Sequence, residues 1–152
     1  MKIAISYSGK ERKRVLNITR IVQGRLKTPD CPEPVFIDQD YQHEVCQVNG
    51  HNYVCAIYDQ AHLVVVFLSP SYQDSTHCTG EWRTIVDRFI TDTRYKNVKQ
   101  LLLIKLGDYD AKTLGLSKRD FPLDGTRITN TDIAEIILNR WDAVEKHLAQ
   151  TN

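Results

Sequence analysis

The chain has neither an excess of charge of one sign nor a long hydrophobic run. Its 20 Lys and Arg residues nearly balance its 19 Asp and Glu residues, so bulk electrostatics gives no reason to expect binding to nucleic acid or an anionic membrane. Its apolar runs are far shorter than the roughly 20 residues that cross a bilayer, and the opening residues form no signal-peptide hydrophobic region. A basic run at residues 10–14 is typical of a solvated helix face. We therefore expect a cytoplasmic protein with no direct nucleic-acid or membrane contact.

Cysteine is scarce, and its spacing shows no pairing. The four residues are Cys31, Cys46, Cys55 and Cys78, with no C-x-x-C pair among them. A chain of 152 residues can build a hydrophobic core without disulfides. No His and Cys pair is accompanied by a second pair at zinc-ligand spacing. The sequence therefore predicts reduced thiols and no metal site.

Several motifs of α/β enzymes are also missing. Ser8-Gly9-Lys10 lacks the earlier glycine and the following Ser or Thr of a P-loop. The chain contains no G-x-G-x-x-G and no G-x-S-x-G, which argues against a dinucleotide-binding Rossmann unit and an α/β-hydrolase. A phospho-receiver would offer an acceptor Asp at the end of its third strand, where this chain has Leu68-Ser69.

What the sequence does contain is an alternation of strand and helix patterns. Short apolar runs predict strands at residues 2–7, 35–37, 63–68 and 100–106, with a short fifth strand at 126–129. Helical periodicity predicts helices at about 11–26 and 53–60, a helix carrying Trp82 in its core stripe, and a last helix capped by Asn130 or Thr131. Residues 39–52 are expected to form a long surface loop. This order predicts one α/β domain over residues 1–152, with a mainly parallel sheet of four to five strands and helices on both faces.

Glu81 lies just beyond the buried strand at 63–68, in or just before the first turns of the next helix. In a parallel sheet the loops after all strands open at one edge, so residues 7–10, 38–52, 69–81 and 107 onward are expected to converge there. A carboxylate at that edge faces the place where a ligand lies. The alternative is an ordinary acid near a helix N-terminus, which contributes about 0.3–1 kcal/mol to the helix.

Four segments resemble the Toll/interleukin-1 receptor (TIR) domain family. Ile3-Ala-Ile-Ser-Tyr-Ser-Gly-Lys10 is similar to the first box of the family, and Val35-Phe-Ile-Asp38 to its second strand and following Asp. Leu63 to Tyr72 resembles the VVVLSPxY strand, and Ser75-x-x-Cys78-x-x-Glu81 resembles the S-x-W-C-x-x-E helix motif. The resemblance covers residues 1 to about 106 and implies a flavodoxin-like TIR fold.

The resemblance implies an activity as well. Enzymatic TIR domains cleave the bond between nicotinamide and ribose in NAD+, giving ADP-ribose or a cyclic product, and the motif glutamate is catalytic. Glu81 is therefore the expected catalytic residue, with NAD+ as substrate and no cofactor. A carboxylate near the ribose orients its hydroxyls and stabilises the oxocarbenium-like charge that develops.

A set of substrate-binding residues follows from the same resemblance. They are Tyr7, Ser8, Gly9, Lys10, Asp38, Tyr41, His77 and Cys78. The two tyrosines are expected stacking surfaces, and the Ser-Gly-Lys segment supplies donors near the pyrophosphate or ribose. Asp38 is expected to hold the following loop by accepting backbone N–H bonds.

Departures from the family pattern affect two regions. His77 replaces the usual tryptophan before the motif cysteine, so an imidazole stands in place of an apolar wall. Residues 42–50 lack the usual Arg-Gly or Arg-Pro pair of the loop through which family members assemble. Self-association through residues 39–52 is still expected, with a fused or separate cyclic-nucleotide sensor, as in filament-forming anti-phage effectors. On this interpretation the chain is an N-terminal effector excised from a longer protein.

Two other classes remain open. A non-catalytic TIR adaptor would use Glu81 only as a structural helix acid. A nucleoside deoxyribosyltransferase-like enzyme would use a glutamate on the N-glycosidic bond of a deoxynucleoside. Product analysis with NAD+ and with deoxynucleosides distinguishes these classes.

Overall fold

The fold is organised around a five-stranded sheet in which every strand is parallel to its neighbours. The structure, a computed structural model, describes residues 2–41, 46, 48–89 and 98–151. The strands are β1 (Ile3–Ser6), β2 (Val35–Phe36), β3 (Leu63–Leu68), β4 (Leu101–Lys105) and β5 (Leu123–Asp124). Their order in the sheet is β2-β1-β3-β4-β5. This is the parallel α/β architecture that the sequence predicts.

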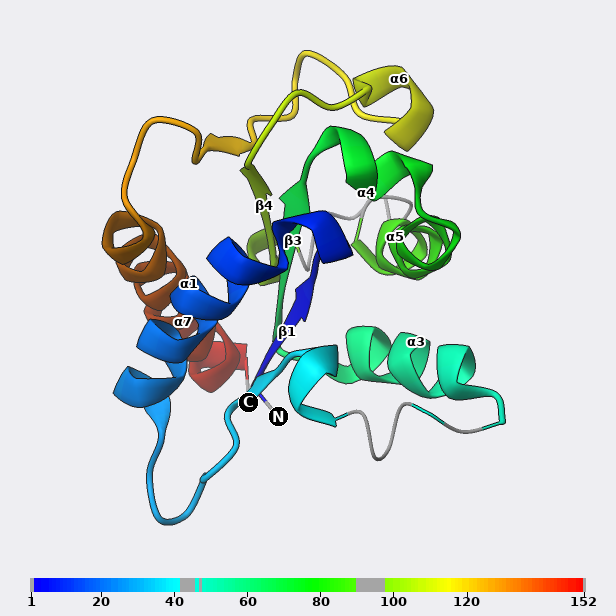
Figure 1. Ribbon diagram of the computed structural model, residues 1–152. Coiled ribbons are helices and arrows are strands. Elements are labelled where there is room, and N and C mark those ends of the chain that lie inside the picture. Colours follow the sequence, from blue (N-terminus) through cyan, green and yellow to red (C-terminus); the bar gives the residue numbers. More distant parts are fainter. Residues whose placement is uncertain (1, 42–45, 47, 90–97, 152) are drawn as a thin grey trace.

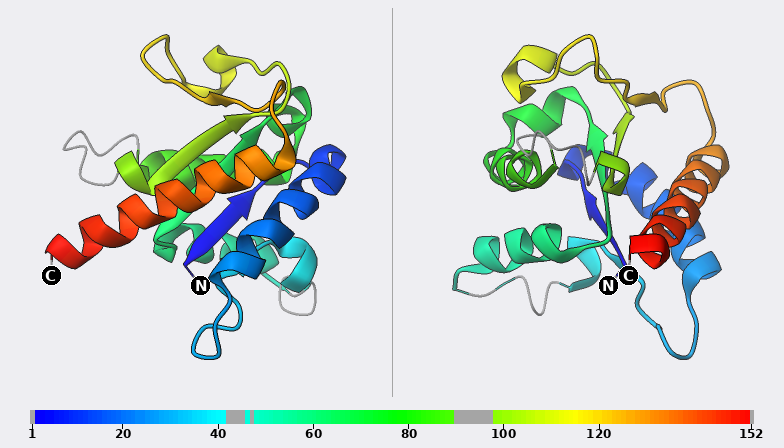
Figure 2. Two further views of the ribbon diagram at one scale, coloured as in Figure 1. Left: turned by 90° about the vertical axis from the view of Figure 1, so that its left-hand side faces the viewer. Right: turned by 180° about the vertical axis from the view of Figure 1, so that it is seen from behind.

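Helices cover both faces of the sheet. They are α1 (Arg12–Leu26), α3 (Gly50–Gln60), α4 (Pro70–Asp74), α5 (Thr76–Phe89), α6 (Ala111–Leu114) and α7 (Asn130–Thr151). Short 3₁₀ helices occupy Gly9–Glu11, Asp38–Tyr41 and Val98–Gln100. Helices α1 and α7 lie together on one face, whereas α3, α4 and α5 lie on the other (Figure 1). Figure 2 shows α7 running along the length of the sheet beside α1.

The central strand β3 explains the continuous apolar run of the sequence. All six of its residues are buried. Leu63, Val65 and Phe67 pack with α1 and α7, while the residues between them pack with α3 and α5. A strand covered on both faces needs apolar side chains at every position.

Two predicted boundaries are wrong. The fifth strand is Leu123–Asp124, paired with β4, and not residues 126–129. It ends there because the Asp124 carboxylate accepts a hydrogen bond from the Thr126 backbone N–H, which turns the chain. In the predicted loop 39–52, residues 38–41 form a 3₁₀ helix, and α3 already begins at Gly50, after Asn49 in a left-handed conformation (φ 63°).

Cys31, Cys55 and Cys78 are free thiols, as the sequence predicts. Within the described residues, no helix is long and apolar enough to cross a membrane.

Helix α7 is capped one residue earlier than the sequence predicts. Thr129 Oγ1 accepts a hydrogen bond from the Asp132 backbone N–H (3.1 Å), and Asp132 Oδ2 accepts one from the Thr129 N–H (3.2 Å). This reciprocal pair is a capping box. Asn130, a predicted cap, instead accepts a hydrogen bond from Arg14 Nε of α1 (2.8 Å).

Thr129→Ala is therefore expected to lower the free energy of unfolding by about 1 kcal/mol, because the first turn of α7 loses its side-chain acceptor. Chemical denaturation measures the change. Thr131→Ala, at the other predicted cap, is the matched control and should leave stability unchanged or slightly higher. A larger loss in the control would place the cap at Thr131.

Candidate functional site

A cavity opens where the strand order reverses. The chain goes from β1 to β2 on one side of the sheet and then to β3 on the other, so the ends of β1 and β3 border a crevice. The cavity there has a volume of about 440 Å³. Its lining residues are Tyr7, Gly9, Arg12, Asp38, Gly50, His51, Val54, Ser75, His77, Cys78 and Glu81. They come from the segments after β1, β2 and β3, together with the start of α3.

Local structure places Glu81 at this cavity. Pro70 starts the short helix α4, and Ser75 then separates it from α5. The Ser75 hydroxyl accepts a hydrogen bond from the Cys78 N–H (3.3 Å), as an N-cap residue does. Because α5 begins at Thr76, Glu81 falls in its second turn, within the first turns that the sequence predicts. His77 and Cys78, which precede Glu81 by four and three positions, share its side of the helix.

The Glu81 carboxylate is anchored to the first strand. Ser6 Oγ donates a hydrogen bond to Glu81 Oε2 (2.7 Å), and Ser6 Oγ lies 2.8 Å from Tyr72 Oη. Burial raises the pKa of Glu81 from 4.5 to about 7. The hydrogen bond from Ser6 and the Tyr58 hydroxyl oppose this rise, whereas the charge of Asp38 adds to it. Near neutral pH the site therefore holds Glu81 in both protonation states.

A second polar group lies across the cavity. Tyr7 Oη donates a hydrogen bond to Asp38 Oδ1 (2.8 Å). Burial and the Asp38 carboxylate raise the pKa of Tyr7 above its ordinary value, and Arg12 opposes this rise. Arg12 is the one Lys or Arg among the described residues that line the cavity. The cavity thus combines two carboxylates with one guanidinium.

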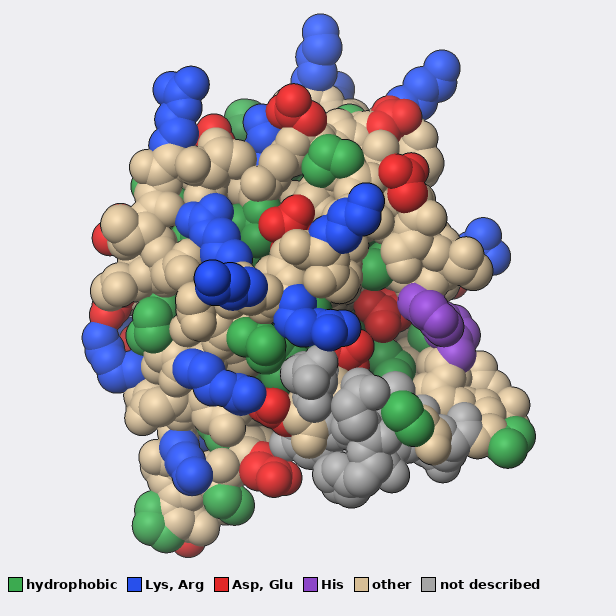
Figure 3. Space-filling model, in the orientation of Figure 1, with side chains coloured by type: hydrophobic (Ala, Val, Ile, Leu, Met, Phe, Trp, Pro, Cys, Tyr) green, Lys and Arg blue, Asp and Glu red, His purple; other side chains and the backbone are tan. Residues whose placement is uncertain are grey.

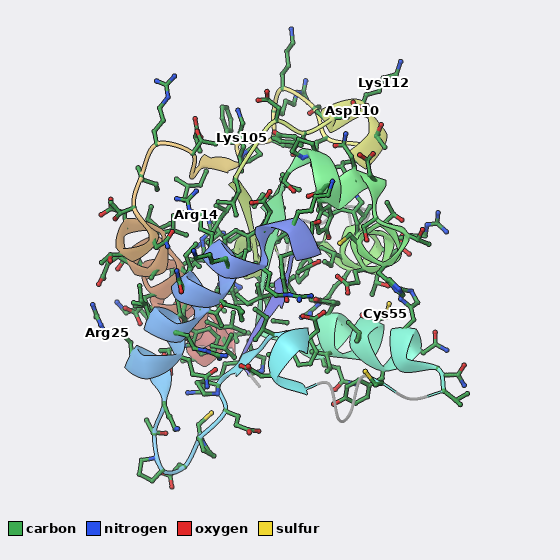
Figure 4. The ribbon with its side chains drawn as sticks, viewed as in Figure 1. Arg14, Arg25, Cys55, Lys105, Asp110 and Lys112 are labelled. Carbon is green, nitrogen blue, oxygen red and sulfur yellow. The ribbon has the colours of Figure 1, made fainter. Side chains whose placement is uncertain are left out.

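Two histidines lie at the cavity between α3 and α5. The rings of His51 and His77 are 6.3 Å apart between centroids. In Figure 3, histidine side chains lie across from basic side chains, with acidic side chains between them. His51 Nε2 lies 3.5 Å from the sulfur of Cys55, whose side chain lies between the two helices (Figure 4). Gly80 makes room for the ring, because a Cβ at this position would lie 2.5 Å from His51 Cε1.

Cys78 is not a nucleophile in this arrangement. Its thiol is buried and donates to the Tyr7 carbonyl oxygen (3.4 Å). Burial raises the pKa of Cys78 to about 11, so the thiol stays protonated at neutral pH. The expected site residue Cys78 is therefore part of the cavity wall.

The structure brings together six of the nine residues expected from the sequence. They are Tyr7, Gly9, Asp38, His77, Cys78 and Glu81. Ser8 is buried but is not among the lining residues. Lys10 lines a separate shallow depression beside α1. Asp38 accepts a hydrogen bond from Tyr7, and much of the loop that it is expected to hold lies outside the described residues.

The remaining expectations concern residues that the structure does not describe. The side chain of Tyr41 falls outside the described part, as do residues 42–45 and 47 of the expected self-association loop.

Trp82 packs in the core, as expected, and donates through Nε1 to the Leu114 carbonyl oxygen (2.9 Å).

Sequence reasoning missed other residues of the site. Arg12 belongs to a basic run that is typical of a solvated helix face, and His51 lies in the predicted loop. Ser6, Tyr58 and Tyr72 surround Glu81 from β1, α3 and α4. One signal was available, because Ser6 is a polar residue within an otherwise apolar strand.

No family model, curated protein or solved structure matches this chain. The TIR resemblance therefore stays a prediction from the motifs. Among the described residues, no group of three or more His, Cys, Asp or Glu side chains is placed to hold a metal ion.

The half-buried Glu81 carboxylate gives stability a distinctive pH dependence. Because the folded state raises the pKa of Glu81 from 4.5 to about 7, folding binds protons between these values. The contribution of Glu81 to stability is then greatest below the unfolded pKa and is lost as pH rises to about 7. Glu81→Gln keeps an acceptor for Ser6 but carries no charge. As pH rises from roughly 4.5 to 8, we expect the free energy of unfolding of this variant to increase relative to that of wild type, by at most about 3 kcal/mol.

Denaturation at a series of pH values measures this difference. Asp87→Asn, which removes an exposed carboxylate from the same helix, is the control and should follow wild type. A constant difference between wild type and Glu81→Gln across the series would show that burial does not perturb Glu81.

The contact between Gly80 and His51 is testable by a double-mutant cycle. Gly80→Ala improves helix propensity by about 1 kcal/mol but forces the His51 ring to move. In a His51→Ala background the obstruction is absent, so Gly80→Ala should stabilise the protein by about that amount. In the wild-type background we expect a smaller gain or a loss. Equal effects in both backgrounds would mean that the ring does not occupy this space.

Proposed function

We propose that this chain cleaves the N-glycosidic bond between nicotinamide and ribose in NAD+, with Glu81 as the catalytic carboxylate. One observation carries the proposal: the Glu81 carboxylate is hydrogen-bonded to Ser6 and lines the cavity at the switch point of the sheet. Ligands of open α/β sheets bind at such points. The motif resemblance gives the same residue the same role.

The charges of the cavity suit this substrate. NAD+ carries a cationic nicotinamide ring on one ribose and an anionic pyrophosphate further along. Glu81 and Asp38 supply negative charge, and Arg12 supplies the positive charge that pairs with a phosphate. A cavity of about 440 Å³ lies within the usual range for small-molecule sites.

The proposed reaction asks little of the protein beyond electrostatics. The bond from ribose C1′ to the ring nitrogen breaks, and its electron pair stays on nicotinamide, which leaves as a neutral molecule. Positive charge develops on C1′ and the ribose ring oxygen. Ionised Glu81 orients the ribose hydroxyls and stabilises that charge. Water then attacks C1′ and loses a proton, giving ADP-ribose, or an adenine nitrogen attacks and gives the cyclic product.

The raised pKa of Glu81 favours this role over a purely structural one. A helix-stabilising acid near an N-terminus gains from the helix dipole and from solvent. Glu81 instead lies where burial disfavours its charge, a pattern typical of functional carboxylates. The adaptor class gives no reason for this arrangement.

Self-association through residues 39–52 and a fused or separate cyclic-nucleotide sensor are part of the proposal. Residues 42–45 and 47 lie outside the described part, so the support here is the motif resemblance alone. The activity is therefore best measured at high protein concentration or with a crowding agent.

The experiment compares nicotinamide release from NAD+ by wild type, Glu81→Gln and Asp87→Asn. We expect Glu81→Gln to lose at least about 100-fold in kcat, as expected when a stabilising group is removed from a developing charge. Asp87→Asn removes a carboxylate about 1.7 turns further along α5 and should retain full activity. Circular dichroism confirms that each variant is folded.

Three results would contradict the proposal. Absence of nicotinamide release under every assembling condition would favour the adaptor class. Base exchange on deoxynucleosides without NAD+ cleavage would favour the deoxyribosyltransferase-like class. Full activity in Glu81→Gln would assign the chemistry to another residue.

A further inference from the structure

Two buried hydroxyl groups are linked to Glu81 by hydrogen bonds but do not line the cavity. Ser6 on β1 and Tyr72 on α4 are both 0% exposed. The hydrogen bonds join Ser6 to residues 66 and 75 positions away in the chain, so three separate elements meet at Glu81. Because neither hydroxyl lines the cavity, neither contacts a substrate bound there. Neither has a role in the proposed reaction as described so far.

The donor protons available on Ser6 and Tyr72 determine the direction of these hydrogen bonds. Ionised Glu81 only accepts hydrogen bonds, so in that state the single Ser6 proton goes to Glu81 Oε2. The Ser6 oxygen is then the acceptor for the Tyr72 hydroxyl at 2.8 Å. Burial and the Glu81 charge raise the pKa of Tyr72 well above its ordinary value, so its proton stays in place. The chain of donation therefore runs from Tyr72 to Ser6 to Glu81.

Packing holds Tyr72, the first donor in this series of hydrogen bonds, in place. The Tyr72 ring meets the Trp82 ring edge-on, with centroids 6.4 Å apart and an interplanar angle of 90°. The indole is fixed in turn by its hydrogen bond to the Leu114 carbonyl oxygen. A buried ring wedged against another buried ring has little rotamer freedom. Tyr72 can therefore hold Ser6 in a single orientation.

We propose that Ser6 and Tyr72 form a hydrogen-bond relay that positions Glu81, engaging Oε2 and leaving Oε1 for the ribose hydroxyls of the substrate. The catalytic part of this inference rests on the proposed function, whereas the relay itself does not. It assigns roles to the serine of the first strand and to the tyrosine of the Ser-Pro-Ser-Tyr turn. Both are positioning residues that act through Glu81.

The relay also favours the ionised carboxylate. Ser6 donates its single proton to the ionised carboxylate, and a hydrogen bond to the charged form lowers the pKa of Glu81. A weakened relay therefore leaves more Glu81 protonated at a given pH. If ionised Glu81 is the active form, the acid side of the activity profile moves to higher pH.

The first test follows the Glu81 carboxyl carbon by NMR during a pH titration of the folded chain, with no substrate present. We expect Tyr72→Phe to raise the midpoint by about half a unit, and Ser6→Ala by about one unit or more. Tyr109→Phe removes a phenol from the same apolar cluster outside the relay and should leave the midpoint unchanged.

The double variant Ser6→Ala/Tyr72→Phe provides the most stringent test of the relay. It leaves no orphaned hydroxyl, so it is expected to fold at least as well as Ser6→Ala. Because Tyr72 acts only through Ser6, its removal should add nothing in the Ser6→Ala background. Additive shifts of the midpoint, or no shift in either single variant, would overturn the relay.

Kinetics supply the second readout. With NAD+ we expect Tyr72→Phe to lower kcat by about 3- to 10-fold, to change KM little and to shift the acid limb upward. Midpoint shifts without NAD+ cleavage by any variant, wild type included, would support the relay and contradict the proposed function. NAD+ cleavage with unshifted midpoints would support the proposed function and overturn the relay.

Discussion

The hydrogen bond from Ser6 to Glu81 is the interaction on which the site depends. A carboxylate taken out of water is stable only when the protein replaces its lost hydrogen bonds. Ser6 supplies one from the last residue of β1, which pairs with Val66 near the end of β3. The chain leaves β3 through α4 and then returns in α5, so Glu81 comes back over β1. A shift of the β1 register by one residue would point Ser6 to the other face and leave the carboxylate without this donor.

This arrangement costs stability, and under the proposed function it places the carboxylate where the reaction needs it. Glu81 could gain solvation energy by pointing outward from the second turn of α5, yet it is held where burial raises its pKa to about 7. Active sites commonly hold groups with such perturbed pKa values, which the surrounding core keeps in place. Here the core consists of two apolar layers, one on each face of the sheet. The cavity carries charged groups of both signs, as does the proposed substrate.

The parts of the fold that local patterns determine could be predicted. The six apolar residues of β3 indicate a strand covered on both faces, and the long amphipathic pattern of α7 indicates a helix packed along the sheet. The short elements were harder to predict because a few polar contacts decide them. Asp124 ends β5 by turning the chain, and Thr129 caps α7 ahead of two equally suitable neighbours. Such choices depend on which backbone N–H each oxygen reaches.

The same limit applies to the site. Residues directly after strands, such as Tyr7 and Asp38, could be expected at the cavity because the topology brings them there. Lys10 is only three positions from Tyr7, but the 3₁₀ turn at Gly9–Glu11 directs it to another surface, whereas Arg12 lines the cavity. Helix phase after a short irregular turn cannot be read from hydrophobic periodicity.

The most direct test of the account is a crystal structure of the chain with an NAD+ analogue whose nicotinamide ribose has CH₂ in place of the ring oxygen. This analogue keeps the cationic ring but cannot form the oxocarbenium-like state, so it should remain intact. The account predicts that the substituted ribose lies in the cavity at the ends of β1 and β3. Its hydroxyls should lie within about 3 Å of Glu81, and its pyrophosphate should face Arg12. An analogue bound elsewhere on the chain, or with its ribose turned away from Glu81, would contradict it.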